Sequence, residues 1–277
     1  MSDNFILNTQ KNDVLRITAY GIKLINKAPC LILVHGFKGF KDWGFFPYTG
    51  EYFSKNGFFV LSFNFSHNGV GENLTDFTEL DKFSKNTLSL EISELNEVIT
   101  AYDDGFFGEN GDNGIGLLGH SRGGAVALLC ANERDDVKAI TTWSAVSNFN
   151  RYTERQKNEW KKNGYFEVIN SRTKQVMRLN VSLLEDIELN KDDSLSIEKA
   201  VSNLNKPLLI AHGDIDLTVP KKEAETIHKW SDKDITELFI VKSAGHTFDI
   251  KHPFEGSNQK CDSVLNRTKQ FFKTHLN

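Results

Sequence analysis

Six short runs of uninterrupted apolar residues constrain the fold of this chain more than any other feature. Each run has the length of a strand whose two faces are both covered. The runs lie at residues 30–34, 58–63, 115–118, 139–143, 208–211 and 238–241. Strands of this kind are typical of a mostly parallel sheet with helices on both faces. The sequence therefore predicts an α/β fold.

Segments with helical character alternate with these runs. Residues 88–102 place four apolar side chains on one stripe, which predicts a helix. Three further helices are expected at residues 122–132, 221–230 and 262–275. This order of strand and helix implies right-handed crossovers. Near the start, residues 14–19 and 22–25 flank Tyr20-Gly21 and predict an antiparallel hairpin.

One long stretch, residues 147–204, breaks the alternation. It has no buried-strand run and is rich in charges, with several aromatic residues among them. Within it, residues 165–169 and 175–179 predict an exposed hairpin, and residues 182–187 predict a helix. Long excursions in compact domains are usually functional. We interpret this stretch as a lid inserted into a core domain formed by residues 1–146 and 205–277.

Length and composition favour one enzyme-sized soluble domain. The 277 residues suffice for a large α/β core with an insertion, and a net charge of -4 without a basic block gives no support for a nucleic-acid partner. The N-terminus lacks the pattern of a secretory signal, and no apolar run could span a bilayer. Three scattered cysteines suit neither a disulfide framework nor a zinc site. We expect a cytoplasmic enzyme without a metal, and leave a homodimer open.

The strongest chemical signal is Gly119-His120-Ser121-Arg122-Gly123, which stands between a buried strand and a helix. A serine on such a sharp turn has a strained backbone and presents its hydroxyl above the sheet. Gly119 and Gly123 leave room for the turn, because a Cβ at either position would crowd its neighbours. Ser121 is therefore the predicted nucleophile.

A serine nucleophile needs a base, and the base needs an acid that orients it. His246 is the best candidate base because it directly follows the last strand, whereas His120 would point into a neighbouring layer. The loop after residues 208–211 offers two carboxylates, Asp214 and Asp216. The chain order of serine, acid and histidine suits this fold, but spacing does not choose between the two.

The oxyanion of such a reaction needs two N–H donors. One is expected from Arg122, the residue after the nucleophile. The other is expected from Phe37 in His35-Gly36-Phe37, which follows the first buried strand. We also predict substrate contacts for a small set of residues near these motifs or in the lid, namely His35, Gly36, His120 and Trp160.

Taken together, these motifs resemble the α/β-hydrolase superfamily over nearly the whole chain. Within it the chain is similar to the bacterial esterase and serine-aminopeptidase-like branch that includes cinnamoyl and feruloyl esterases. The H-G-x-x-D-x-x-V-P pattern of that branch makes Asp216 the implied acid and Asp214 an ordinary loop residue. Similar esterases carry an insertion after the sixth strand, as this chain does. The loop at residues 64–71 departs from the usual pattern, so no exact substrate follows.

The expected function is hydrolysis of small-molecule carboxylic esters, with short acyl or aryl groups, through an acyl-enzyme on Ser121 and without a cofactor. A serine peptidase of the aminopeptidase or prolyl-peptidase type would use the same triad, and a thioesterase remains open as well. A third alternative is a non-catalytic binding protein on the same scaffold, because a fold does not determine a function.

Overall fold

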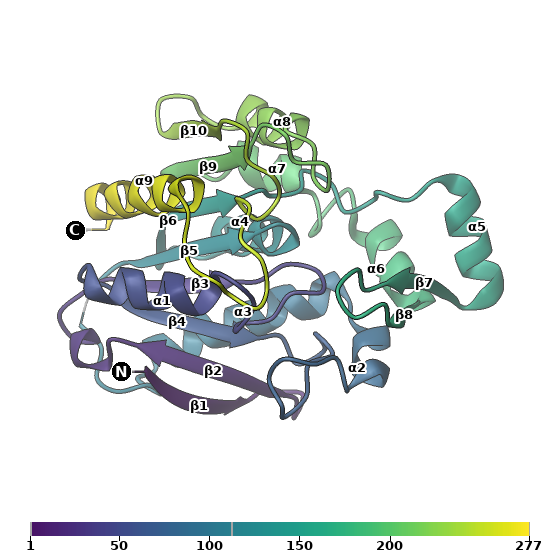
Figure 1. Cartoon of the computed structure of the whole chain (residues 1–277), viewed down its shortest axis with the longest axis horizontal. Helices are drawn as coiled ribbons and strands as arrows, with labels where there is room; N and C mark the ends of the chain where they lie inside the picture. Colours follow the sequence, from purple (N-terminus) through teal and green to yellow (C-terminus); the bar gives the residue numbers. More distant parts are fainter. Residues whose placement is uncertain (1, 112, 277) are drawn as a thin grey trace.

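The computed structural model describes residues 2–111 and 113–276 and contains one central sheet of eight strands (Figure 1). In spatial order the strands are β1 (Ser2–Asn8), β2 (Val14–Tyr20), β4 (Phe59–Asn64), β3 (Cys30–Val34), β5 (Ile115–His120), β6 (Val137–Trp143), β9 (Leu208–Gly213) and β10 (Thr236–Val241). The pairs β1–β2 and β2–β4 are antiparallel, and all the others are parallel. The six predicted strands are thereby confirmed; five are buried, whereas the edge strand β10 is half-buried except at Val241.

Helices cover both faces of the sheet, as expected from strands without a polar side. On β3, Leu31 and Leu33 face a core that includes α1 (Phe46–Lys55) and α9 (Gln259–His275). Ile32 and Val34 alternate with them and face the other core. That core includes the helices α3 (Leu88–Asp103), α4 (Arg122–Glu133), α7 (Ile197–Ser202) and α8 (Lys222–Trp230). The predicted mostly parallel sheet with helices on both faces is confirmed.

The expected N-terminal hairpin is wrong. Residues 22–25 do not form a strand, because Gly21 takes a left-handed conformation and starts a short 3-10 helix at Ile22–Leu24. The antiparallel partner of β2 is instead β1, which the sequence analysis missed. This edge strand is mostly exposed, with only Phe5 and Leu7 half-buried, so its apolar pattern is weak.

Between β6 and β9 the chain forms a group of elements beyond the carboxyl ends of the parallel strands (Figure 1). They are α5 (Glu154–Asn163), the hairpin of β7 (Tyr165–Ile169) and β8 (Val176–Asn180), and α6 (Val181–Asn190), followed by α7. The predicted hairpin and helix are both present. The hairpin contacts α2 (Leu80–Lys85), whereas α7 packs against α4 and α8.

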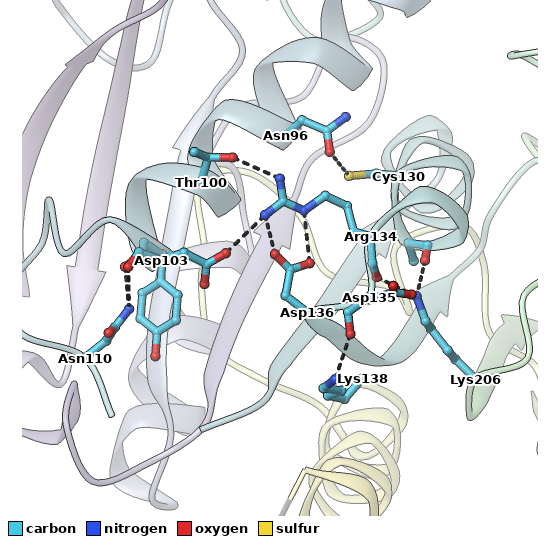
Figure 2. Close-up of polar contacts among 12 residues, drawn as sticks. Asn96, Thr100, Asp103, Asn110, Cys130, Arg134, Asp135, Asp136, Lys138 and Lys206 are labelled. Atoms are coloured by element: carbon cyan, nitrogen blue, oxygen red, sulfur yellow. Dashed lines mark hydrogen bonds and ion pairs between the residues drawn. The ribbon is translucent and has the colours of Figure 1, made fainter. Parts of the chain in front are cut away.

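A cluster of polar contacts lies at the C-terminal end of α4 (Figure 2). Arg134, just after the helix, donates to Thr100 at 2.9 Å and to Asp103 at 3.1 Å on α3, and to Asp136 at 3.0 Å. Lys206, before β9, donates to the carbonyl oxygen of Arg134 at 2.5 Å. These contacts hold α3, α4 and β9 together, and so support the helix whose opposite end carries Ser121.

None of the described helices is long and apolar enough to cross a membrane.

Candidate active site

Ser121 lies on a sharp turn between β5 and α4. Its backbone has φ 57° and ψ -124°, a strained region for a residue with a side chain. A Cβ on Gly119 would meet the backbone of Gly123, and a Cβ on Gly123 would meet the carbonyl oxygens of Val34 and His35. The two glycines therefore allow the close approach that this turn needs. The amide of Ser121 donates to the carbonyl of Trp143 at 2.8 Å, which ties the turn to β6.

His246 and Asp216 form a hydrogen-bonded pair. His246 Nδ1 lies 2.7 Å from Asp216 Oδ2, while Oδ1 accepts from the amides of Thr218 and Val219 at 2.8 Å each. Asp216 is buried, which alone would raise its pKa, but His212 and His246, whose nitrogens lie 3.5 and 2.7 Å from Oδ2, hold the pKa below the usual value. Asp216 is therefore an ionised carboxylate that orients the imidazole. Asp214 is exposed, so of the two carboxylates that spacing leaves open it is Asp216 that contacts His246.

Ser121 and His246 line the same cavity. The ring of His120, next to Ser121 in the chain, lies 4.8 Å from the ring of His246, centroid to centroid. Within residues 2–111 and 113–276, the Ser121 hydroxyl has no hydrogen bond. In free enzymes the contact between nucleophile and base is often long and tightens when substrate binds.

The loop after β3 lies against the serine turn. A Cβ on Gly36 would be 2.8 Å from the carbonyl oxygen of His120, 2.8 Å from Ser121 Cβ and 3.3 Å from the amide nitrogen of Arg122. This close approach puts the next residue, Phe37, beside the nucleophile. The Arg122 amide is in the first turn of α4 and so lacks an intrahelical partner. Among the described residues, no group accepts a hydrogen bond from the Phe37 amide. Both predicted oxyanion donors are therefore available at this place.

The side chains of these two donor residues also touch. The Arg122 guanidinium lies 4.7 Å from the centroid of the Phe37 ring, and that ring stacks on Phe83 at 5.7 Å. Arg122 forms an ion pair with Glu91 of α3, whose carboxylate also accepts from Asn86 at 2.7 Å. Glu91 is buried, which raises its pKa, and Arg122 opposes that rise. The pair fixes the start of α4 against α3 and Phe37.

The other predicted contact residues have different positions. Gly36 and His120 line the cavity, whereas His35 and Trp160 do not. His35 accepts from the Phe65 amide at 3.3 Å and donates through Nδ1 to the Gly36 carbonyl at 3.0 Å, so it braces the loop from behind. Trp160 is fully buried, and its ring stacks on Phe166 at 5.3 Å.

Both buried histidines near the nucleophile are neutral. Burial lowers the pKa of His35 to about 4, and burial with the nearby His246 lowers the pKa of His120 to about 3. His120 Nε2 lies 3.0 Å from the carbonyl oxygen of His246 and therefore donates to it. His120 thus holds the backbone of the base rather than acting as a base itself.

The cavity has a volume of about 810 Å³, enough for a small organic molecule. Its walls come from the loop after β3, the serine turn, the loops after β6, β9 and β10, the β7–β8 turn and α6. Apolar side chains such as Phe46, Phe149 and Tyr152 form much of the lining. A polar edge with a nucleophile and an apolar wall is the arrangement expected for hydrolysis of an acyl compound.

Residues 110–277, more than half of the chain, match the profile of the prolyl oligopeptidase family. The chain belongs to the prolyl oligopeptidase family. That assignment covers the serine turn, the acid loop and the histidine loop. No curated protein sequence matches the chain significantly.

Several solved structures share the fold of this prolyl oligopeptidase family member. Est1E from Butyrivibrio proteoclasticus with bound ferulic acid is 20% identical, with 98% of each chain covered and a TM-score of 0.73. The α/β hydrolase GrgF from Penicillium sp. sh18 is 18% identical, with 100% of this chain and 99% of that chain covered and a TM-score of 0.75. The Pyrococcus furiosus esterase Pf2001 is 17% identical, with 100% and 92% covered and a TM-score of 0.67. The resemblance to the α/β-hydrolase superfamily is confirmed.

The sequence analysis missed two residues that support the site, Glu91 and His212. Glu91 as the partner of Arg122 could not be found, because the two are joined only by the packing of α3 on α4. His212, whose Nε2 donates to the Val219 carbonyl at 2.8 Å, supports the acid loop from β9. The only sequence feature that points to this supporting position is the pair His212-Gly213 at the end of β9.

Proposed function

We propose that the chain is a serine hydrolase that cleaves carboxylic esters through an acyl-enzyme on Ser121. One observation carries the proposal: a serine in a strained strand-to-helix turn shares a cavity with a histidine whose Nδ1 is held by a buried carboxylate at 2.7 Å. Strain of this kind costs about 1–3 kcal/mol and is kept where a function requires it. A serine that merely capped a helix would need neither the strain nor the histidine–carboxylate pair.

The reaction would begin with attack of Ser121 Oγ on the ester carbonyl while His246 Nε2 takes the hydroxyl proton. Asp216 keeps the proton of Nδ1 in place and stabilises the imidazolium. The amides of Phe37 and Arg122 would donate to the developing oxyanion, and loss of one such donor typically costs about 100- to 1,000-fold in rate. The alcohol leaves with the proton from His246. Water then attacks the acyl-enzyme with His246 again as base.

The ester substrate is supported by the cavity and by two relatives. The walls near Ser121 include Phe46, Phe149 and Tyr152, which suit a short acyl or aryl group. The structural relative Pf2001 is an esterase, and the structure of Est1E holds ferulic acid. We propose residues 147–204 as the lid of this site, because Arg151, Arg172 and Leu183 from that stretch line the cavity.

A serine peptidase is the second candidate, favoured by the match to the prolyl oligopeptidase family. An aminopeptidase needs acidic groups to hold the substrate amine. None of the acidic residues of α6 lines the cavity, and two have partners elsewhere: Asp186 accepts from the amides of Leu88 and Ser89 at 2.9 and 3.0 Å, and Glu188 pairs with Lys161 at 2.6 Å. The charge of the cavity thus favours an ester over an amine-bearing peptide. A thioester would use the same groups.

We propose the cytoplasm as the compartment, since all three cysteines are free and buried. The small molecule is the only partner that this site requires, and the homodimer stays a prediction.

The deciding experiment compares initial hydrolysis rates on nitrophenyl esters of increasing acyl length, a feruloyl ester and a matched aminoacyl anilide. Each is measured with the natural chain and with Ser121→Ala. Ester turnover that disappears in Ser121→Ala supports the proposal, and the preferred acyl group gives the size of the pocket. Anilide turnover above ester turnover would assign a peptidase instead. No turnover by folded protein on any substrate would refute a general esterase.

A further inference from the structure

The Lys, Arg, Asp and Glu residues that line the cavity are all cationic. Five cationic side chains line it: Lys38, Arg122, Arg151, Arg172 and Lys251. Among the described lining residues there is no Asp and no Glu. The chain as a whole carries a net charge of -4, so the cavity is a cationic site in an acidic protein.

Most of these cations are not neutralised by a carboxylate. Arg122 pairs with Glu91, but over residues 2–111 and 113–276 no ion pair involves the other four. Three of them instead donate to backbone carbonyls, Lys38 to Ile169 at 3.0 Å, Arg151 to Thr218 at 2.9 Å and Arg172 to Thr75 at 3.0 Å. A carbonyl bond orients a cation but leaves its charge, so these groups keep the capacity to bind an anion.

Two of the cations lie on or against the β7–β8 hairpin. Lys38 reaches Ile169 at the end of β7, and Arg172 lies three residues further on, in the β7–β8 turn. Burial and then the charge of Arg172 lower the pKa of His252, which is next to Lys251, while the carboxylates Asp42 and Asp76 oppose that shift. Burial lowers the pKa of Lys38, a cost that a bound anion would offset. The β7–β8 turn thus brings two cationic side chains, Lys38 and Arg172, to this part of the cavity wall.

We propose that the physiological ester carries a carboxylate, and that Lys38 and Arg172 recognise it at the β7–β8 turn. This rests on the proposed ester hydrolysis and adds the substrate class. A guanidinium presents its donors in a fork that matches a carboxylate, and an ammonium adds a second charge. The reaction itself is unchanged: water and the ester give an acid and an alcohol, and the recognised carboxylate takes no part in the bond changes.

The test uses pairs of esters that differ only in charge. With the carboxylate on the acyl side, the pair is monoethyl adipate and the ethyl ester of adipic acid monoamide. With the carboxylate on the alcohol side, the pair is 4-acetoxybenzoate and 4-acetoxybenzamide. Each kcat/KM is divided by the rate of hydroxide-catalysed hydrolysis. We expect the natural chain to prefer the anion of at least one pair by about 10- to 100-fold, the range for hydrogen bonds to a charged group.

Three variants connect that preference to the turn. In Arg172→Gln the preference should fall about tenfold, with a further fall when Lys38→Gln is added, while Arg172→Lys should keep most of it. Arg155→Gln is the matched control, because Arg155 is an exposed lid cation that does not line the cavity. It should leave the preference unchanged. Rising salt should reduce the preference of the natural chain.

Equal rates on both members of each pair would overturn the carboxylate proposal and leave ester hydrolysis standing, since turnover lost in Ser121→Ala measures that independently. A preference that survives the double variant would also overturn it. Absence of turnover on all four esters and on the nitrophenyl series would refute the ester function itself.

Discussion

Replacing Asp216 by Asn tests the catalytic acid without disturbing the loop. In the natural chain Oδ1 accepts from the amides of Thr218 and Val219, and Oδ2 from His246. The Asn oxygen should stay on the two amides, because they need an acceptor, so its NH2 group must face His246. That histidine then accepts at Nδ1 and carries its proton on Nε2, where it cannot take one from Ser121.

The expected loss is large because the variant selects the wrong tautomer while keeping the geometry. In serine proteases the corresponding change costs about 10,000-fold in kcat, which is about 5 kcal/mol in transition-state free energy. The assay is ester turnover at neutral pH, with circular dichroism to confirm folding. Asp214→Asn is the control, since Asp214 is exposed and its backbone amide, which donates to Val241 at 3.1 Å, is unchanged. Asp216→Asn with more than a tenth of natural kcat would refute the reasoning.

Three further changes have distinct expected results. Gly36→Ala should lower kcat about 100-fold, because its Cβ would be 2.8 Å from Ser121 Cβ and displace a donor loop; natural turnover would contradict this. Glu91→Gln should destabilise the fold by about 3 kcal/mol, because the Arg122 cation loses its anionic partner. Thermal unfolding should show a lower Tm, and an unchanged Tm would contradict this. Burial raises the pKa of Glu94 to about 7, so the folded state keeps a proton that the unfolded state releases near pH 4.5. Stability should therefore fall as pH rises from about 4.5 to 7, by on the order of 3 kcal/mol, and Glu94→Gln should flatten this dependence of Tm on pH.

Local patterns predicted those parts of the fold that local physics decides. A run such as Cys30–Val34 is buried on both faces, so its composition alone marks a central strand. The edge strand β1 has one exposed face and a weak pattern, and was missed. The stretch Ile22–Leu24 misled because its apolar residues alternate like a strand, whereas the left-handed Gly21 turns the chain there.

In the candidate site too, some features follow from a few neighbouring residues and others depend on the whole fold. The serine turn is encoded within a few residues, because its two glycines are required by close backbone contacts. Which of Asp214 and Asp216 points toward His246 depends on the turn of the acid loop, so spacing alone could not choose. The cavity cations come from the loop after β3, the start of α4, residues 147–204 and the loop after β10. Only the folded chain shows that they line one cavity whose described lining holds no carboxylate.

The cationic lining of the cavity bears on why we propose esters as the substrates of a member of a peptidase family. The triad is neutral toward this choice, because attack by Ser121 on an ester and on an amide uses the same groups. Discrimination must therefore come from the rest of the cavity. A substrate with a free amine would enter a site lined by cations and would gain no carboxylate partner there, which disfavours it by like-charge repulsion. A substrate with a carboxylate is instead attracted by the same cations. On our proposal, the residues that exclude an aminopeptidase substrate also select an anionic ester.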